Sequence, residues 1–377
     1  MNKIIILISA FIFIFISTSK IFAENDNDPV YNASFKSKIY NEIKENYKYY
    51  GFSSFYNDHQ YFIFKDSYLD KLDSNWVTLN KNEYLIVSNR LYVLLVQLDD
   101  VRVRKLSGDG SVEFDGLNEF NIQNTLINKV EKNNLSTIDK DLIQLRYHHL
   151  WAPLAYLSLL IETSLELIQE NISKNWGITI IIFTIFFKIF LLPINIIAAQ
   201  YQKNIAIIQS KIDPIISDIK SEFSGEEAHN KIMQVYKNAN ISPFYTMKSM
   251  ISLLIQIPFL IAIFNTLAEM TQFIDADFLW INSLAYPDSI AELSFAIPLL
   301  GSEINILPIL MSLIVIISTI FYKNDYLSNV RIKKQKNNLY LMAILFFVLF
   351  YTFPSSMVLF WLSSNLIQIL FQKLFKI

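Results

Sequence analysis

The chain contains no cysteine among its 377 residues. This absence excludes disulfide bonds, thiolate metal sites and a lipid-modified N-terminus of the bacterial lipoprotein kind. The sequence also lacks a phosphate-binding loop, a metal-ligand cluster and a nucleophile set beside its base. We therefore predict no enzymatic activity, no catalytic residue, no metal site and no cofactor.

The chain is instead rich in apolar residues. Hydrophobic residues make up 53% and aromatic residues 15% of it, and its mean hydropathy is +0.32. This composition is too apolar for an ordinary soluble domain and is typical of a membrane protein. The formal net charge of −2 gives no indication of a nucleic-acid partner, and none is predicted.

Residues 1–23 have the pattern of an export signal. Lys3 precedes the apolar run from Ile4 to Ile16, and acidic Glu24 follows Ala23. Cleavage after Ala23 would leave a signal peptide, whereas an uncleaved segment would serve as a signal anchor. The sequence leaves both alternatives open.

Residues 24–145 are polar and carry several short apolar segments, which predicts a small soluble α+β domain outside the cytoplasm, in the periplasm. Serine, glycine and aspartate at residues 107–110 predict a turn. We expect helices at Ser37–Tyr49 and Ile122–Lys132. The β-branched and aromatic segments predict strands at Gln60–Lys65, Glu83–Ser88, Leu91–Leu98, Val101–Leu106 and Ser111–Phe114.

Residues 150–171 predict an amphipathic helix that lies flat on the outer leaflet of the membrane. Leu154, Leu157, Ile161, Leu165 and Ile168 recur at helical spacing, and glutamates occupy other faces. The alternative is a soluble helix that caps the outer domain. His148 and His149 precede it, but adjacent residues do not share a helical face, so no metal site is predicted there.

Five apolar runs predict an all-α polytopic membrane bundle of five core transmembrane helices over residues 175–374. Each run approaches the length of about 20 residues that a helix needs to cross the hydrocarbon layer. The runs are Trp176–Ala199, Lys248–Met270, Asn305–Tyr322, Leu339–Phe353 and Met357–Leu374.

The distribution of basic residues predicts the orientation of these helices. Lysines cluster between the first and second runs, and lysines and an arginine cluster between the third and fourth, so both segments belong in the cytoplasm. No basic residue lies between Lys248 and Lys323, so that loop faces outward. Residues 24–170 are then periplasmic and the C-terminus is cytoplasmic. Residues 201–240 predict a cytoplasmic helical hairpin, which either packs on itself or serves as a docking arm.

Lys188 lies inside the first apolar run, where a lysine costs about 2.5–3.5 kcal/mol at the centre of a membrane helix. No Asp or Glu lies in the interior of any predicted span to neutralise it. Snorkelling toward the cytoplasm is one explanation. A water-filled groove is the other, and the polar residues that share helical stripes in the spans make it the stronger one. The predicted groove residues are Lys188, Thr184, Asn195, Gln256, Trp361 and Asn365.

Several motifs in this order resemble the YidC family of membrane protein insertases. The resemblance covers about Trp151 to the C-terminus. It rests on Asn175-Trp176-Gly177, the intramembrane cation with Pro193 and Gln200, Leu254–Phe259, Phe353–Trp361 and Ser364–Leu366. It implies an insertase and chaperone in the bacterial inner membrane. In such an insertase, the groove takes the short polar tail of a nascent membrane protein, and the hydrophobic segment is released into the lipid bilayer. The Sec translocon and the ribosome are further candidate partners.

The sequence also departs from the family pattern. Lys188 stands where the family has arginine, which keeps the charge but loses the planar fork of donors. Glycines expected before the second span and after Pro354-Ser355 are missing, in a chain with only seven glycines. Two alternatives therefore stay open beside an insertase: a specialised, non-inserting scaffold or assembly factor with the same fold, and a transporter or channel.

Overall fold

The computed structural model describes residues 30–45, 47–106, 111–117, 122–123, 125–239, 241–242, 251–323 and 327–375. The predicted signal segment, residues 1–23, and the predicted turn at residues 107–110 lie outside these ranges. Two compact units make up the chain. The first comprises Met1–Glu162, Asn265–Asn305 and Leu349–Ser356, and the second comprises Thr163–Phe264, Ile306–Val348 and Met357–Ile377.

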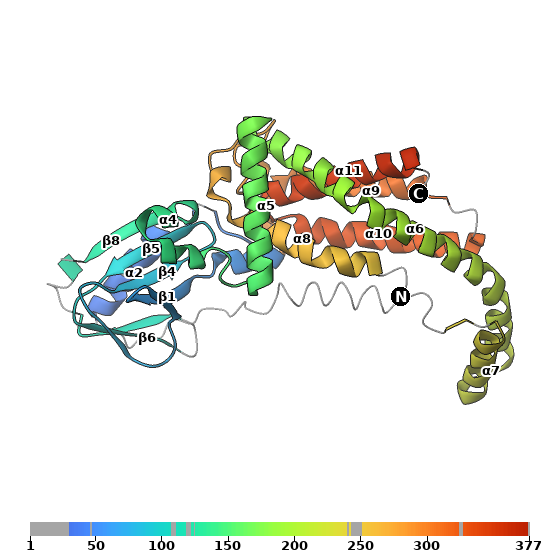
Figure 1. The fold of residues 1–377 in the computed structure, drawn as a ribbon, viewed down its shortest axis with the longest axis horizontal. Coiled ribbons are helices and arrows are strands. Elements are labelled where there is room, and N and C mark those ends of the chain that lie inside the picture. Colours follow the sequence, from blue (N-terminus) through green and yellow to red (C-terminus); the bar gives the residue numbers. More distant parts are fainter. Residues whose placement is uncertain are drawn as a thin grey trace. The chain divides into compact units, whose positions relative to one another are not determined.

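The first unit is built around two antiparallel sheets (Figure 1). A five-stranded sheet has the order β2-β1-β4-β5-β8, and a three-stranded sheet has the order β3-β6-β7. The strands are β1 (Gln60–Lys65), β2 (Tyr68–Lys71), β3 (Val77–Leu79), β4 (Tyr84–Ser88), β5 (Tyr92–Gln97), β6 (Val101–Lys105), β7 (Val112–Asp115) and β8 (Leu126–Glu131). The helical segments are α2 (Val30–Ile43), η1 (Gly51–Asn57), η2 (Lys132–Asn134), α4 (Leu135–Ile138) and η3 (Lys140–Leu145).

Alternation along the central strands divides the interior of this unit into two cores, because successive side chains of a strand point to opposite faces. One core lies between the five-stranded sheet, α2 and the three-stranded sheet, and it includes Phe35, Ile39, Ile63 and Leu94. The other lies under α4 and η3 and includes Phe62, Phe64, Ile86, Val93, Leu95, Leu135 and Leu142. Both faces of the sheet are therefore covered.

The predicted strands at residues 60–65, 83–88, 91–98, 101–106 and 111–114 are confirmed within a residue or two at each end. The predicted helix at Ile122–Lys132 is wrong over most of its length, because Leu126–Glu131 forms β8 and pairs with β5. Ile127 packs against the first core and Val130 belongs to the second. The burial of these two side chains on opposite faces of the sheet and the pairing of β8 with β5 favour a strand more than the weak helical periodicity favours a helix.

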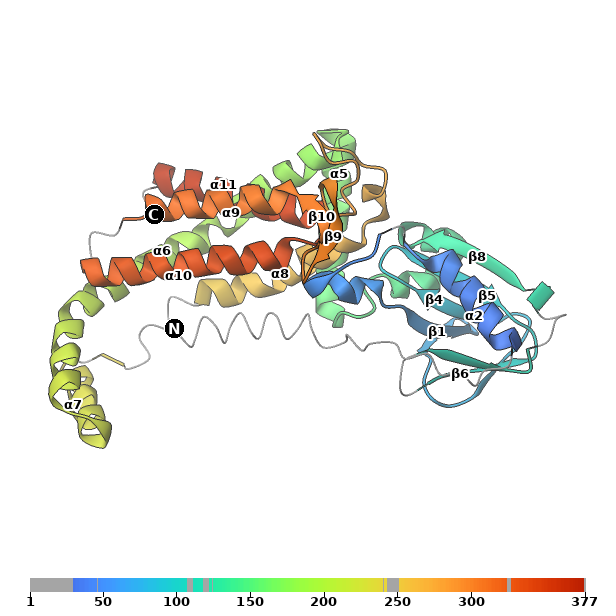
Figure 2. The same ribbon diagram turned by 180° about the vertical axis from the view of Figure 1, so that it is seen from behind.

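The outward loop of the predicted topology contains unexpected structure. η5 (Thr271–Phe273) is followed by a hairpin of β9 (Ser289–Ile297) and β10 (Gly301–Asn305). Figure 2 labels the two strands of this hairpin. The sequence predicts only an outward loop without basic residues here, because the two strands carry no long β-branched run.

A buried arginine joins distant segments of the first unit. Arg90 lies between β4 and β5, pairs with Glu45 at 2.9 Å, and donates to the carbonyl of Ala268 at 2.5 Å. Its guanidinium also lies 5.2–5.7 Å from the ring centres of Tyr49, Tyr56 and Tyr286. The pair with Glu45 and the aromatic faces offset part of the cost of removing this charge from water.

The second unit consists of helices. They are the later part of α5 (Ala152–Asn171), α6 (Trp176–Glu222), α7 (Gly225–Asn238), most of α8 (Ile251–Glu269), α9 (Ile306–Ile320), most of α10 (Asn329–Phe350) and most of α11 (Ser355–Phe375). Within this unit, α11 is central, because aromatic side chains on α6, α8 and α10 all contact its first turns.

Among the described residues, α6 alone is both long and apolar enough to cross a membrane. Its most apolar window is only 22% buried, which suits a helix surrounded by lipid better than the core helix of a soluble protein. Leu254–Glu269 and Ile306–Ile320 are shorter apolar helices. The fold is therefore mostly helical with a β-rich extra domain, and the count of five spans stays a prediction.

Candidate functional site in the apolar helices

Lys188 lies halfway along the apolar part of α6. This helix begins at Trp176, where the side chain of Asn175 accepts a hydrogen bond from the backbone N–H of Ile178 at 3.1 Å and so caps the first turn. Lys188 is half-buried, and its Nζ donates to Oε1 of Gln368 on α11 at 3.3 Å. Within the described part of the chain it forms no ion pair. An amide oxygen thus orients the ammonium group without neutralising it.

Asn195, two turns further along α6, faces α8. Its Oδ1 accepts a hydrogen bond from Nε2 of Gln256 at 3.0 Å. Both residues are half-buried, and the pair satisfies one donor and one acceptor that would be costly to leave bare beside hydrocarbon. The predicted groove residues Asn195 and Gln256 are therefore direct neighbours.

Thr184 and Trp361 occupy more enclosed places. Thr184 is fully buried and donates its hydroxyl proton to the carbonyl of Ile180, one turn earlier, at 2.6 Å. Trp361 is half-buried, with ring centres of Phe264 and Phe346 at 5.7 and 5.3 Å. In this structure both side chains contribute to helix packing.

Asn365 follows Trp361 by about one turn of α11. Its Nδ2 is buried and has no hydrogen-bond partner among the described residues. A buried amide donor without an acceptor costs free energy.

The structure places Gln368, which is not among the six predicted groove residues, beside Lys188. Gln368 lies on the same polar stripe of α11 as Trp361 and Asn365, seven and three residues later. Two hydrogen-bonded pairs, Lys188 with Gln368 and Asn195 with Gln256, connect α6 to α11 and to α8. These contacts set side chains separated by 180 and 61 residues next to each other.

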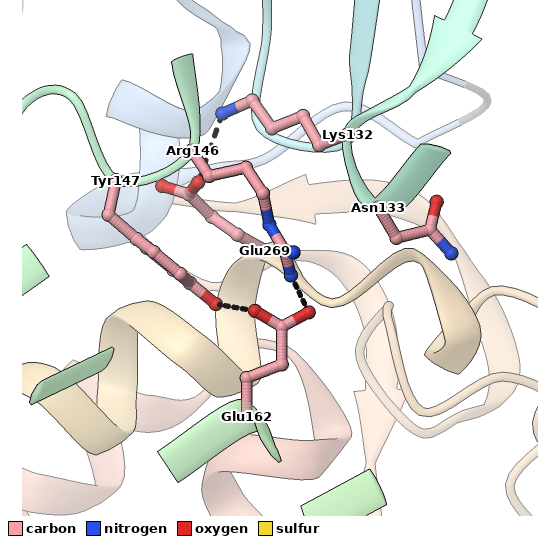
Figure 3. A pocket seen from close by; sticks show the side chains of 6 residues that line it. All are labelled: Lys132, Asn133, Arg146, Tyr147, Glu162 and Glu269. Carbon is pink, nitrogen blue, oxygen red and sulfur yellow. Dashed lines mark hydrogen bonds and ion pairs between the residues drawn. The ribbon is translucent and has the colours of Figure 1, made fainter. Parts of the chain in front are cut away.

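A second polar cluster lies in the first unit and has a different character (Figure 3). Arg146 pairs with Glu162, which also accepts from the hydroxyl of Tyr147 at 2.9 Å, and Lys132 pairs with Glu269 at 3.0 Å. Burial raises the pKa of Tyr147 well above its usual value, so its hydroxyl stays protonated and keeps donating. Side chains fill this pocket, which leaves no space for a water-sized ligand. The cluster joins four segments of the first unit through its buried ion pairs.

The helical region matches a known protein family. The model of the family described as 60Kd inner membrane protein matches residues 167–377, which is more than half of the chain. The chain belongs to this family. Membership makes it a protein of the bacterial inner membrane and confirms the YidC resemblance predicted from the sequence motifs. The matched residues include all six predicted groove residues and Gln368.

Individual family members align over the same region. The membrane protein insertase YidC of Chlamydia muridarum is 32% identical over 211 residues, which cover 54% of this chain and 26% of that protein. The membrane protein insertase YidC of Treponema denticola is 29% identical over 234 residues, which cover 60% of this chain and 39% of that protein. The alignments thus span less than half the length of these relatives. A crystal structure of an active YidC insertase with its first transmembrane domain resolved aligns with a TM-score of 0.39 and 15% identity, over 82% of each chain.

Proposed function

We propose that this inner-membrane protein is a membrane protein insertase and chaperone. Its clients are nascent membrane proteins with a short polar tail next to a hydrophobic segment. The observation that carries the proposal is Lys188, a cation held by the amide oxygen of Gln368 inside an apolar helix of a chain that belongs to the YidC family. A non-inserting scaffold would gain nothing from such a charge, and the named relatives do not favour that alternative.

The proposed groove consists of Lys188, Thr184, Asn195, Gln256, Trp361 and Asn365, with Gln368 added. Lys188 attracts carboxylates of the client tail, and a carboxylate competes with the neutral amide of Gln368 because its charge binds the ammonium more strongly. The buried Nδ2 of Asn365 offers a second donor. Meanwhile the hydrophobic segment enters the lipid, and the burial of about 20 apolar residues drives the step without a nucleotide or another cofactor.

We further propose the orientation that the charge distribution indicates. Five helices cross the membrane, residues 24–170 lie in the periplasm, and the C-terminus and the predicted hairpin of residues 201–240 lie in the cytoplasm. The lack of basic residues between Lys248 and Lys323 supports this orientation. The Sec translocon and a translating ribosome are proposed partners on the path that delivers clients.

Complementation tests the proposal. The resident insertase of a Gram-negative host is depleted, this chain is expressed, and insertion of a small single-span client is scored by protease accessibility. Lys188→Ala and Lys188→Arg are compared with Lys174→Ala, which removes an exposed lysine whose Nζ donates to the carbonyl of Glu170.

We expect rescue by the native chain, Lys188→Arg and Lys174→Ala, and loss of rescue with Lys188→Ala. Rescue by all four chains would keep the insertase and refute the role of the charge. Failure of all four, with each protein stably in the membrane, would refute the insertase and favour the scaffold.

A further inference from the structure

The loop between α8 and α9 displays apolar side chains at two tight turns. Phe278 and Ile281 exchange backbone hydrogen bonds of 2.9 and 2.8 Å, so Leu279 and Trp280 form the tip of a two-residue turn. The β9–β10 hairpin turns at Pro298–Leu300. Leu279 and Leu299 are 75% and 56% exposed, and both are among the most exposed apolar residues of the first unit.

Both leucines stand in backbone conformations that leucine disfavours. Their φ angles are +54° for Leu279 and +69° for Leu299. Glycine or asparagine occupies such turn positions at much lower cost, because a bulky side chain clashes with its own backbone there. Leucine at both positions therefore lowers the stability of the folded chain. Contact of each leucine side chain with an apolar partner would offset that loss.

The tip of the β9–β10 hairpin is continuously apolar. No charged residue occurs from Leu293 to Gly301. Phe295, Ile297 and Leu299 are 63%, 36% and 56% exposed. The acidic residues lie outside this segment, at Glu292 and Glu303, which face each other across the two strands.

The hairpin is held firmly on its other side. A Cβ atom on Gly51 would lie 2.3 Å from the carbonyl oxygen of Leu299, and one on Gly301 would lie 2.9 Å from the ring of Tyr50. Two of the seven glycines in the chain thus permit the close approach of residues 50–51 to residues 299–301. The hydroxyl of Tyr351 also donates to the carbonyl of Glu303 at 3.0 Å. The exposed tip is therefore presented by a fixed backbone, which lowers the entropy cost of binding.

The covalent chain keeps this tip close to the membrane. β10 ends at Asn305 and α9 begins at the next residue, so Gly301 cannot lie more than about 17 Å from the first residue of α9. α9 is a helix of 15 residues without a charge, and its exposed residues are Ile309, Leu313, Ile317 and Ile320. In the proposed orientation α9 is one of the membrane spans, so lipid covers these exposed apolar side chains.

We propose that the β9–β10 hairpin and the Leu279–Trp280 turn insert their apolar tips into the outer leaflet of the membrane. The ligand is the interfacial acyl region of the lipids. Anionic headgroups do not contribute, because the whole stretch from Ser249 to Tyr322 contains no basic residue. The proposal is independent of insertase activity, since it concerns only where this loop lies.

The absence of native cysteine makes the test direct. Phe295→Cys and Ile297→Cys are labelled with the environment-sensitive fluorophore NBD in the full chain. The labelled proteins are placed in phosphatidylcholine nanodiscs, whose two faces are both open to an aqueous quencher. Tyr68→Cys is the matched control, because Tyr68 is 75% exposed on β2 and lies in no segment joined directly to an apolar helix. Thermal unfolding of each variant establishes that it is folded.

We expect doxyl-labelled lipid to quench the two hairpin positions at least twofold more than position 68, and iodide to quench them at least twofold less. Equal access of iodide at all three positions would overturn the proposal. Protection of the hairpin from both quenchers would also overturn it, since the tip would then be covered by protein, such as a second copy of this chain. Equal results with and without phosphatidylglycerol in the nanodisc are expected, and insertion that requires the anionic lipid would contradict the apolar mechanism.

Discussion

The guanidinium of Arg90 donates a hydrogen bond of 2.5 Å to the carbonyl of Ala268, 178 residues later in the chain. The carbonyls at the end of a helix lack partners within the helix, and Arg90 supplies one for the last turn of α8. The same arginine pairs with Glu45 and lies against three tyrosine rings. Burial by itself lowers the pKa of Arg90, but attraction to Glu45 raises it, and the pKa is raised overall.

Replacement of Arg90 by methionine should destabilise the fold strongly. It leaves the carboxylate of Glu45 buried without its cation, which costs about 3–5 kcal/mol in comparable buried pairs. Arg90→Lys should recover only part of the loss, because lysine cannot reach Glu45 and Ala268 with one planar fork. Thermal unfolding of the detergent-solubilised protein measures both effects.

Arg102→Met is the matched control for Arg90. Arg102 pairs with Asp115, but both side chains are about half exposed, so the expected loss is at most about 1 kcal/mol. An equal decrease in melting temperature for Arg90→Met and Arg102→Met would show that the buried arginine has no special role.

Gly51→Ala should destabilise the protein more than Gly225→Ala. Both glycines have a positive φ, +59° and +63°, so both substitutions cost about 1 kcal/mol in backbone strain. Only at Gly51 does the added Cβ also approach a backbone oxygen, that of Leu299, within 2.3 Å, whereas nothing lies within 4 Å at Gly225. A melting temperature lowered clearly further by Gly51→Ala is expected, and equal decreases would argue against the close approach.

Lowering the pH should destabilise the first unit through His59. Burial lowers the pKa of His59 from about 6.5 to about 4, so the unfolded chain binds the proton first. Its contribution to stability is therefore complete above pH 6.5 and is lost as the pH falls toward 4. The change in melting temperature between pH 7 and pH 4.5 should be smaller in His59→Gln than in the native chain. His229→Gln, at an exposed position on α7, should leave that change unaltered.

Two substitutions of Gln368 separate charge from shape in the proposed groove. Gln368→Glu places a carboxylate about 3.3 Å from Nζ of Lys188 and should neutralise it, so insertion of a client with an acidic tail falls about as far as with Lys188→Ala. Gln368→Leu removes the amide and leaves the charge, so insertion should be largely retained. The complementation assay compares them at matched expression, and loss of activity only with Gln368→Leu would refute the role of the charge.

Local sequence signals predicted the elements that depend on neighbours in the chain. The aromatic and β-branched content of Gln60–Lys65 and the continuous apolar run after Trp176 each indicate an element from local sequence alone. β8 was missed because its own sequence carries no strand pattern, and only its hydrogen bonds to β5 make this segment a strand. β9 and β10 were missed because their exposed, partly apolar residues do not follow the alternation that a half-buried strand requires.

The sequence by itself determined that this is a membrane protein of the YidC family with a cation, Lys188, inside an apolar helix, because hydropathy and charge are properties of single residues and short runs. Only the tertiary structure decided that Gln368 holds Lys188, that Gln256 meets Asn195 and that Arg90 completes the end of α8. These partners are 61 to 180 residues apart. Such contacts form only after the helices and strands pack, and packing depends on the shape of the whole core, which no local pattern encodes.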